Sequence, residues 1–306
     1  MTPAPPIPAC RVRACAKVNL DLRVLGVRPD GYHDLATVFQ SVDLTDELRI
    51  EPGRHEGIVI TCSDPRVPRD ERNLVWRAAH LLCRELDVEL PALQISIEKR
   101  IPAEAGLGGG SADAAAMLLG LNAMLGTPAP VEGLLDFAAV LGADVPFMLM
   151  GGTALGTGRG DVLHSLPDLP PHEVVIVHPG YGVSTAEAYR WLDEMGAGEG
   201  TVPEWPARTS GWSRALEACR NDLQSPVFGR HPELAGVVEA LRCDGARLAA
   251  MTGSGSAIFG LFAPGDDAAG AAQRLAGTGR VVVTARTLGK ADFDRLTRPV
   301  LTAALA

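Results

Sequence analysis

Residues 102–121 read Pro-Ala-Glu-Ala-Gly-Leu-Gly-Gly-Gly-Ser-Ala-Asp-Ala-Ala-Ala-Met-Leu-Leu-Gly-Leu. Four glycines between positions 106 and 110 precede Ser111, and strong helix formers follow from Ala112 onward. Ser111 is a preferred N-cap residue, and Asp113 is expected to place negative charge in the first helical turn. A glycine loop that leads into a helix leaves backbone N–H groups unpaired, and such groups bind anions. The stretch therefore predicts a nucleotide-phosphate loop, although a strand-to-helix turn without a ligand would show the same pattern.

Two familiar phosphate loops fit this stretch poorly. The P-loop needs Gly-Lys followed by Ser or Thr, and no lysine stands between Arg100 and Lys290. The dinucleotide fingerprint needs a glycine where Ser111 stands, and an acidic partner that is missing nearby. The pattern Pro-x-x-x-Gly-Leu-Gly-Gly-Gly-Ser instead resembles the phosphate-binding motif of the GHMP kinases, the superfamily of galactokinase, homoserine kinase, mevalonate kinase and phosphomevalonate kinase.

This resemblance implies a fold and a nucleotide. The fold is α+β with two domains, a ribosomal protein S5 domain 2-like α/β domain at residues 1–165 and a ferredoxin-like α+β domain at residues 166–306. ATP is the expected nucleotide, with a magnesium ion expected between its phosphates. The loop residues expected to bind ATP are Pro102, Ala103, Glu104, Ala105, Gly106, Leu107, Gly108, Gly109, Gly110, Ser111 and Ala112. Some members carry Ser-Ser-Asn where this chain has Ser-Ala-Asp, so a contact from position 112 is lost.

Composition limits the class of protein. A chain of 306 residues with 46% hydrophobic and 21% charged residues is typical of a soluble globular protein of two domains. The net charge of −9 argues against nucleic acid or an anionic membrane as partner. The six cysteines form no Cys-x-x-Cys pair and no His-x-x-x-His occurs, so reduced thiols and no zinc site are expected. The proline-rich start is no signal peptide. We therefore expect a cytoplasmic protein that acts on small molecules, and the sequence leaves its oligomeric state open.

Residues 10–25 alternate as a strand does. Val18 and its apolar neighbours at i+2 and i+4 fall on one face, and Lys17, Asn19 and Asp21 fall on the other. A polar face of this kind is often only a solvated strand surface. A turn at residues 29–31 follows, so the next residues should emerge from a loop beside the strand.

These residues narrow the resemblance. Ala16-Lys17-Val18-Asn19-Leu20, followed by Gly31-Tyr32-His33, looks like the start of the 4-diphosphocytidyl-2-C-methyl-D-erythritol kinases, the GHMP enzymes of the non-mevalonate isoprenoid route. The resemblance implies that Lys17 assists catalysis and that Asn19, Tyr32 and His33 line the substrate pocket.

The chain from residue 35 to the loop reads as strands and one helix. Strands are expected within 35–60, with a turn near residues 52–53, and again at 93–97. Helical spacing of apolar residues covers 73–86. By the family pattern Asn73 lies near the adenine and Lys99 near the nucleotide. From the residues alone, a plain helix start and a plain surface lysine are equally consistent.

A helix is expected at 131–141, ended by Gly142. The segment Gly-Ala-Asp-Val-Pro follows, and its aspartate is Asp144. A lone aspartate between apolar residues is commonly a helix cap. In the resembled family this segment supplies the catalytic aspartate. One aspartate can cap a helix and act in catalysis at the same time.

The second half begins after a proline-containing link at 163–171. Strands are expected at 174–177, 248–251, 258–262 and 281–284, helices from 184 and over 268–275, and an irregular excursion at 196–212. Counted from His-Pro-Gly, Tyr189 falls where the family places an aromatic ring against cytosine, although a helix tyrosine is commonly core packing. Residues 252–257 form a second glycine loop that resembles the third GHMP motif. Asn221-Asp222 matches a family pair whose role is open, and the tail beyond Leu288 shows no pattern.

Together these features predict an ATP-dependent kinase for the 2-hydroxyl of a cytidyl-diphosphate-linked methylerythritol. Asp144 would be the general base, and Lys17 would orient it. Three alternatives stay open: a GHMP kinase for homoserine or a mevalonate phosphate, a flavin or nicotinamide oxidoreductase, and an inactive binding module of the same fold. The Gly-Tyr-His segment argues against another GHMP kinase, and the missing fingerprint argues against an oxidoreductase. The presence of both Lys17 and Asp144 argues against an inactive module.

Overall fold

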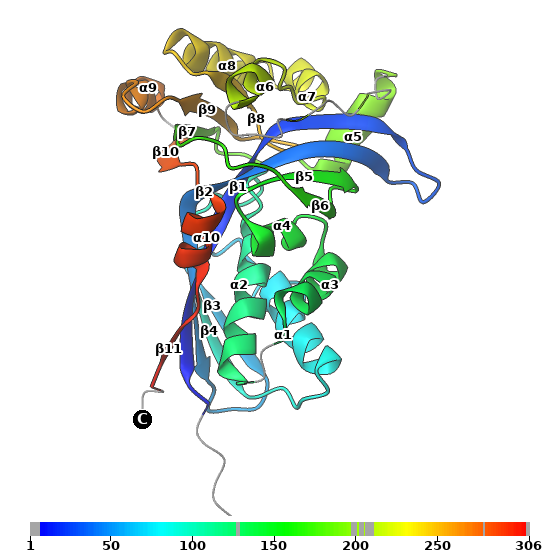
Figure 1. Ribbon diagram of the computed structural model, residues 1–306, viewed down its shortest axis with the longest axis vertical. Coiled ribbons are helices and arrows are strands. Elements are labelled where there is room, and N and C mark those ends of the chain that lie inside the picture. The colour runs from blue at the N-terminus through cyan, green and yellow to red at the C-terminus, as the bar shows by residue number, and fades with distance from the viewer. Residues whose placement is uncertain are drawn as a thin grey trace, which may run out of the picture.

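The computed structural model describes residues 7–126, 129–196, 201, 205, 211–277 and 279–303. These residues form two sheets with helices packed on them, as the α+β expectation requires (Figure 1). In the described part of the chain no helix combines the length and the apolar character needed to cross a membrane. The six cysteines are free thiols. Most of the excursion expected at 196–212 lies outside the described residues.

The first sheet is built on two long strands that pair antiparallel. They are β1 (Ala9–Val27) and β2 (His33–Pro52), and the sheet order is β11-β1-β2-β4-β3. The other strands are β3 (Ile58–Cys62), β4 (Leu93–Glu98), β11 (Val300–Thr302), and β5 (Thr153–Gly158) with β6 (Val162–Ser165), which branch from β2. The strands expected at 10–25, 35–60 and 93–97 are therefore confirmed.

The polar face predicted on β1 is not a solvated surface. Lys17, Asn19 and Asp21 are all buried, because both faces of the strand are covered at this point. The pairing with β2 shifts register between Cys15 and Lys17 and again between Asn19 and Asp21. Such bulges bend a strand and re-aim its side chains.

Four helices cover one face of the first sheet (Figure 1). They are α1 (Leu74–Glu85), α2 (Gly109–Met124), α3 (Val131–Leu141) and α4 (Val145–Met150). Helix α2 contacts β1, β2 and the other three helices. It is therefore buried on nearly every side, which is why its residues are apolar all round. A Cβ on Gly120 would stand 2.6 Å from Ile50 Cδ1, which shows how closely α2 packs on the sheet. The helices expected at 73–86 and 131–141 are confirmed.

The second sheet has the order β10-β7-β9-β8 and is antiparallel throughout. Its strands are β7 (Glu173–His178), β8 (Leu248–Met251), β9 (Ile258–Phe262) and β10 (Val281–Arg286). Its helices are α5 (Thr185–Glu194), α6 (Trp212–Glu217), α7 (Gln224–Arg230), α8 (Glu233–Cys243) and α9 (Ala268–Leu275). Val175 and Val177 pack in the cluster that includes α5, α7, α8 and α9, whereas Val174 and Ile176 belong to the cluster of the first sheet. The two halves therefore share one continuous core across the faces that meet.

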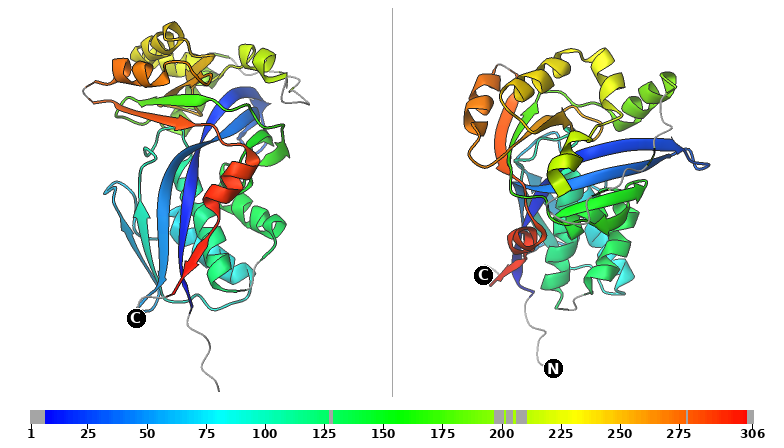
Figure 2. Two further views of the ribbon diagram at one scale, coloured as in Figure 1. Left: turned by 60° about the vertical axis from the view of Figure 1, so that its left-hand side comes forward. Right: turned by 45° about the horizontal axis from the view of Figure 1, so that its top comes forward.

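The described part of the tail beyond Leu288 forms regular structure, although its sequence showed no pattern. It forms α10 (Lys290–Thr297) and then β11, which pairs with β1 at the edge of the first sheet. Figure 2 shows this red segment running back along the long blue strands. The division into residues 1–165 and 166–306 stays a prediction, and the structure adds that the last described segment lies on the first sheet.

Candidate active site

The glycine loop between β4 and α2 is shaped by left-handed backbone. Gly106 and Gly108 have φ of +75° and +72°, and Glu104 between them and β4 has φ of +55°. Helix α2 begins at Gly109 with Gly108 as its N-cap, so the expected cap at Ser111 is wrong, and Asp113 lies beyond the first turn. A left-handed cap residue needs glycine, which explains why the helix begins before the serine. The N–H groups of Gly109, Gly110 and Ser111 have no partner in the described part of the chain.

The residues of the loop divide into exposed and packed ones. Gly110 and Glu104 are exposed, and Ser111 is half-buried, so the helix start faces open space. Pro102, Ala103, Gly106, Gly108 and Gly109 are also half-buried, and Ala105, Leu107 and Ala112 are buried. The side chains of the buried three shape the loop, and only their backbone could reach a phosphate.

The second half of the chain holds the loop in place. A Cβ on Gly106 would stand 2.2 Å from the carbonyl oxygen of Thr252, and Ala257 donates its N–H to the Ala105 carbonyl at 3.2 Å. A Cβ on Gly182, in the connection between β7 and α5, would stand 2.6 Å from Glu104 Cβ. The second glycine loop, at residues 252–257, thus packs against the first.

Lys17 and Asp144 come together beside this helix start. Lys17 Nζ lies 3.4 Å from Asp144 Oδ2, and the lysine side chain is 3% exposed while that of Asp144 is 34% exposed. The aliphatic stem of Lys17 runs past Gly108, where a Cβ would stand 3.4 Å from Lys17 Cε. The carboxylate is therefore open to a ligand, and the ammonium lies between it and the loop.

A buried hydrogen-bond network holds Lys17. Asn19 Oδ1 accepts from Lys17 Nζ at 2.7 Å, and Asn19 Nδ2 donates to the Thr37 hydroxyl at 2.8 Å. The Asn19 N–H donates to the Thr252 hydroxyl at 3.1 Å. Both the oxygen and the nitrogen of the Asn19 amide are therefore engaged within the protein, and the oxygen orients the Lys17 ammonium. A contact of Asn19 with the substrate stays a prediction.

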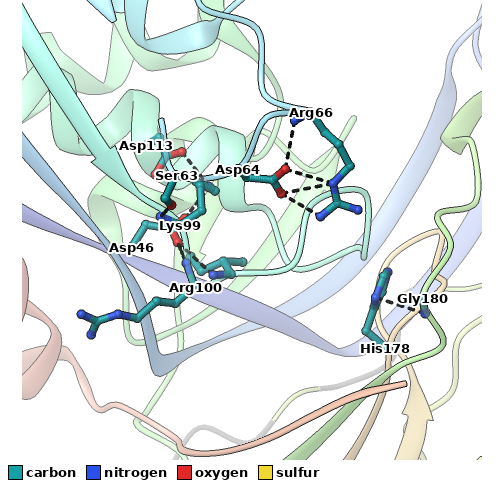
Figure 3. Close-up of polar contacts among 10 residues, drawn as sticks. Asp46, Ser63, Asp64, Arg66, Lys99, Arg100, Asp113, His178 and Gly180 are labelled. Atoms are coloured by element: carbon teal, nitrogen blue, oxygen red, sulfur yellow. Dashed lines mark hydrogen bonds and ion pairs between the residues drawn. The ribbon is translucent and has the colours of Figure 1, made fainter. Parts of the chain in front are cut away.

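Lys99 lies under the start of α2, with its ammonium between two carboxylates (Figure 3). It pairs with Asp46 and with Asp113, the latter at 2.7 Å, and its side chain is 6% exposed. Burial lowers the pKa of Lys99, but the two carboxylates outweigh this and raise it. Burial, offset in part by Lys99, raises the pKa of Asp113 to about 7. A Cβ on Gly109 would stand 3.2 Å from Lys99 Nζ, so this cluster supports the helix start from behind.

Asn73 is the N-cap of α1. Its Oδ1 accepts from the Val75 N–H at 2.9 Å and its Nδ2 donates to the Pro68 carbonyl at 2.6 Å. Both ends of the amide are thus engaged in the cap and the preceding loop, which is the plain helix start that the sequence left open. A contact of Asn73 with adenine stays a prediction.

Three of the residues expected to bind the substrate lie near the hairpin between β1 and β2. His33 stacks on Tyr189 of α5 with 4.7 Å between ring centroids, and burial and the nearby Asp144 carboxylate raise the pKa of Tyr189. Tyr32 is exposed, and the Arg159 guanidinium stands 5.4 Å from its ring centroid. The structure therefore brings His33, Tyr189 and Asp144 together and leaves Tyr32 at the rim.

Sequence reasoning missed several residues of this site. Thr252 was seen only as part of a glycine loop, and Asp46 and Asp193 were not singled out. Asn221 turns out to hold the second glycine loop, since its Nδ2 donates to the carbonyls of Met251 and Gly253 at 2.7 and 2.8 Å. The available signal was that these polar residues stand within or next to expected strands and helices. Their partners lie far away in the sequence, so only the fold identifies them.

Comparison with known families matches two models. The GHMP kinases N terminal domain matches residues 73–152, and the GHMP kinases C terminal model matches residues 208–281. The 4-diphosphocytidyl-2-C-methyl-D-erythritol kinase of Geobacter metallireducens is 42% identical over 86% of this chain and 93% of that protein. The enzyme of the same name from Moorella thermoacetica is 43% identical over 90% of this chain and 98% of that protein.

Solved structures agree with these relatives. A 4-(cytidine 5'-diphospho)-2C-methyl-D-erythritol kinase superposes with a TM-score of 0.75 at 37% identity, over 91% of this chain and 99% of that one. A homoserine kinase from Cytophaga hutchinsonii gives a TM-score of 0.65 at 20% identity, over 96% of this chain and 97% of that one. The second likeness is one of fold alone.

Proposed function

Because the chain belongs to the GHMP kinases and, among them, to the 4-diphosphocytidyl-2-C-methyl-D-erythritol kinase family, we propose that it transfers the γ-phosphoryl group of ATP to the 2-hydroxyl of 4-diphosphocytidyl-2-C-methyl-D-erythritol. Membership of a kinase family sets aside the oxidoreductase alternative. The observation that carries the proposal is the Lys17–Asp144 pair, which lies beside N–H groups at the start of α2 that have no partner among the described residues.

Phosphoryl transfer needs positioning and neutralisation of charge. The N–H groups of Gly109, Gly110 and Ser111 would bind ATP phosphate oxygens, helped by the positive end of the helix dipole. Asp144 would accept the proton of the attacking hydroxyl, since its side chain is 34% exposed and Lys17 is its one ion-pair partner among the described residues. Lys17 would orient Asp144 and oppose the negative charge that develops on the transferred group.

Magnesium fits this arrangement as a companion of the nucleotide. In the described part of the chain no three His, Cys, Asp or Glu side chains gather as a metal site. Mg²⁺ is commonly held by nucleotide phosphates with one or two protein oxygens and several waters, so it needs no preformed cluster of protein side chains. When bound it would supply charge neutralisation between the phosphates.

The cytidyl end of the substrate would meet His33 and Tyr189, with Tyr32 at the rim and Asn19 beneath the reacting end. A product-based assay tests the proposal. The pure chain is incubated with ATP, magnesium and, separately, the cytidyl substrate, homoserine, mevalonate and mevalonate phosphate, and ADP release is followed. ADP release with the cytidyl substrate alone is expected. Release with one of the other alcohols, and none with the cytidyl substrate, would refute the proposal.

A further inference from the structure

His33 has a second partner besides Tyr189. Its Nε2 lies 2.9 Å from Oδ1 of Asp193, which stands one helical turn after Tyr189 on α5. The His33 side chain is only 12% exposed, whereas that of Asp193 is half exposed. This contact joins the first sheet to a helix of the second half, at the wall of the site (Figure 1 shows α5 beside the hairpin of β1 and β2).

The chemistry of this contact fixes where the imidazole carries its proton. An ionised carboxylate only accepts hydrogen bonds, so His33 Nε2 must donate to Asp193. In the neutral imidazole the other nitrogen, Nδ1, is then an unprotonated acceptor. His33 Nδ1 makes no hydrogen bond with the described residues and is not among their fully buried polar atoms without a partner. It is therefore free to accept from a ligand.

The two common pyrimidines differ at the group that such an acceptor reads. Cytosine carries an amino group at position 4, which donates, whereas uracil carries a carbonyl oxygen there, which accepts. We propose that Asp193 is a positioning residue that fixes the tautomer of His33, so that Nδ1 accepts from the 4-amino group of cytosine and disfavours uracil. This inference rests on the proposed function, since it needs a cytidyl substrate in the pocket formed by His33 and Tyr189.

The expected effect is a change in base preference. Uracil would bring its O4 against the lone pair of Nδ1, and one mismatched base contact lowers binding about 5- to 150-fold. A purely structural role of Asp193 would weaken both substrates equally. The ratio of kcat/KM for the cytidyl substrate to that for its uracil analogue therefore isolates the proposed role.

Four variants make the test sharp. Asp193→Asn offers either an acceptor or a donor, so both tautomers become accessible and the ratio should fall at least fivefold. Asp193→Lys offers only donors and favours a proton on Nδ1, so the ratio should fall further. Asp193→Glu keeps the carboxylate and should retain the wild-type preference. Glu194→Gln is the matched control, because Glu194 pairs with Arg230 at 2.6 Å and not with His33.

The variants should fold, since Asp193 is half exposed and removing an acid from the last turn of a helix is neutral or favourable. Melting curves accompany the assays, which are run at pH 8.5, where a free imidazole is neutral. An unchanged ratio in both the Asn and the Lys variants overturns the inference, as does a wild-type chain that uses both bases equally well. In those cases the cytidyl substrate is still turned over and the proposed function stands. A wild-type chain inactive on the cytidyl substrate overturns both.

Discussion

Asp144 stands at the N-cap position of α4, yet its side chain makes no cap hydrogen bond with the described residues of that helix. Its carboxylate points instead to Lys17, at 3.4 Å. A capping aspartate would have its oxygens occupied by N–H groups of the first turn. The geometry therefore removes the capping alternative that the sequence left open. A partly exposed carboxylate beside a buried ammonium supports the general base that we propose.

Replacing Asp144 by Asn should nearly abolish turnover while ATP still binds. Loss of a positioned base costs on the order of 10²–10⁴ in rate. Stability should change little, because no cap bond is lost. Turnover, a calorimetric titration with an ATP analogue and a melting curve check this. Near-native turnover would return Asp144 to a structural role.

Tyr189 is both a wall of the proposed pocket and a neighbour of the second core. If its ring contacts cytosine, Tyr189→Ala should weaken the cytidyl substrate by about 1–3 kcal/mol, the usual worth of one base–aromatic contact. The KM for ATP should barely change, and Tyr189→Phe should be mild because the ring survives. If Tyr189 is core packing instead, the alanine variant should lose about 3–5 kcal/mol of stability. A parallel rise of both KM values together with a lower melting temperature would contradict the pocket assignment.

At the scale of elements, the helix start shows where sequence rules succeed and fail. The glycine loop and the following helix were predicted from glycines and helix formers, and the structure has both. The cap was misplaced because Ser111 obeys the N-cap preference, whereas the chain uses the left-handed conformation of Gly108 and begins α2 before the serine. In the same way the alternation along β1 predicted the strand, but not that its polar face would be buried. Burial depends on what packs there, and Thr252 arrives from more than two hundred residues away.

Gly110 offers a test of the loop as a ligand site. Its φ lies outside the left-handed region, and a Cβ there would meet only Leu74 Cδ1, at 3.9 Å. Folding therefore does not require glycine at this position. Gly110→Val should keep the melting temperature within a few degrees and lower ATP affinity at least tenfold, because the new side chain stands where phosphates would bind.

The contrasting variant is Gly106→Val. A Cβ on Gly106 would stand 2.2 Å from a backbone oxygen and at a φ of +75°, so this variant should lose stability as well as affinity. Calorimetry with an ATP analogue and thermal melts compare the two. Native affinity in a well-folded Gly110→Val would mean that the loop is only a turn.

The cluster of Lys99, Asp46 and Asp113 predicts a pH dependence. Burial raises the folded-state pKa of Asp113 to about 7, above its ordinary value of 3.8. Between these two values the folded chain holds a proton that the unfolded chain has released, so this group makes stability fall as pH rises through that window. Asp113→Asn removes the effect and leaves Lys99 paired with Asp46 alone.

The free energy of unfolding of Asp113→Asn relative to wild type should therefore rise from pH 4.5 to pH 7, by at most about 1.4 kcal/mol per pH unit. Urea unfolding at these two pH values measures it. The control is Asp136→Asn, at an exposed position for which the described residues supply no ion-pair partner. A constant difference between Asp113→Asn and wild type would show that Asp113 is ionised throughout.

At the scale of the whole molecule, the candidate site is made where the two halves meet. Lys17, Asp144 and the glycine loop could be chosen as candidate site residues from the sequence, because each stands in a short motif of neighbouring residues. Pairs such as Asn19 with Thr252, or His33 with Asp193, join residues separated by 233 and 160 positions and carry no local signal. Only the packing of the second sheet on the first brings them together, which is why these partners were not predicted.

The tail beyond Leu288 showed no sequence pattern, yet its helix α10 packs against the first half of the chain. Phe293 of α10 is fully buried with Cys15 and Leu288, and a Cβ on Gly151 would stand 2.1 Å from its ring. Gly151 directly follows α4, the helix that begins after Asp144. The tail therefore packs against the end of the helix whose start carries the proposed base.

Phe293→Ala should lower the free energy of unfolding by about 3–5 kcal/mol, as expected for a large aromatic side chain removed from a packed site. Val300→Ala on β11 is the control, since Val300 is exposed and its loss should cost less than about 0.5 kcal/mol. Below the melting temperature of the variant, both KM values should stay close to wild type, because Phe293 is not among the residues proposed to bind either substrate. Denaturant unfolding measures the stabilities. Equal, small costs for the two variants would mean that α10 is only appended to the surface and does not brace α4.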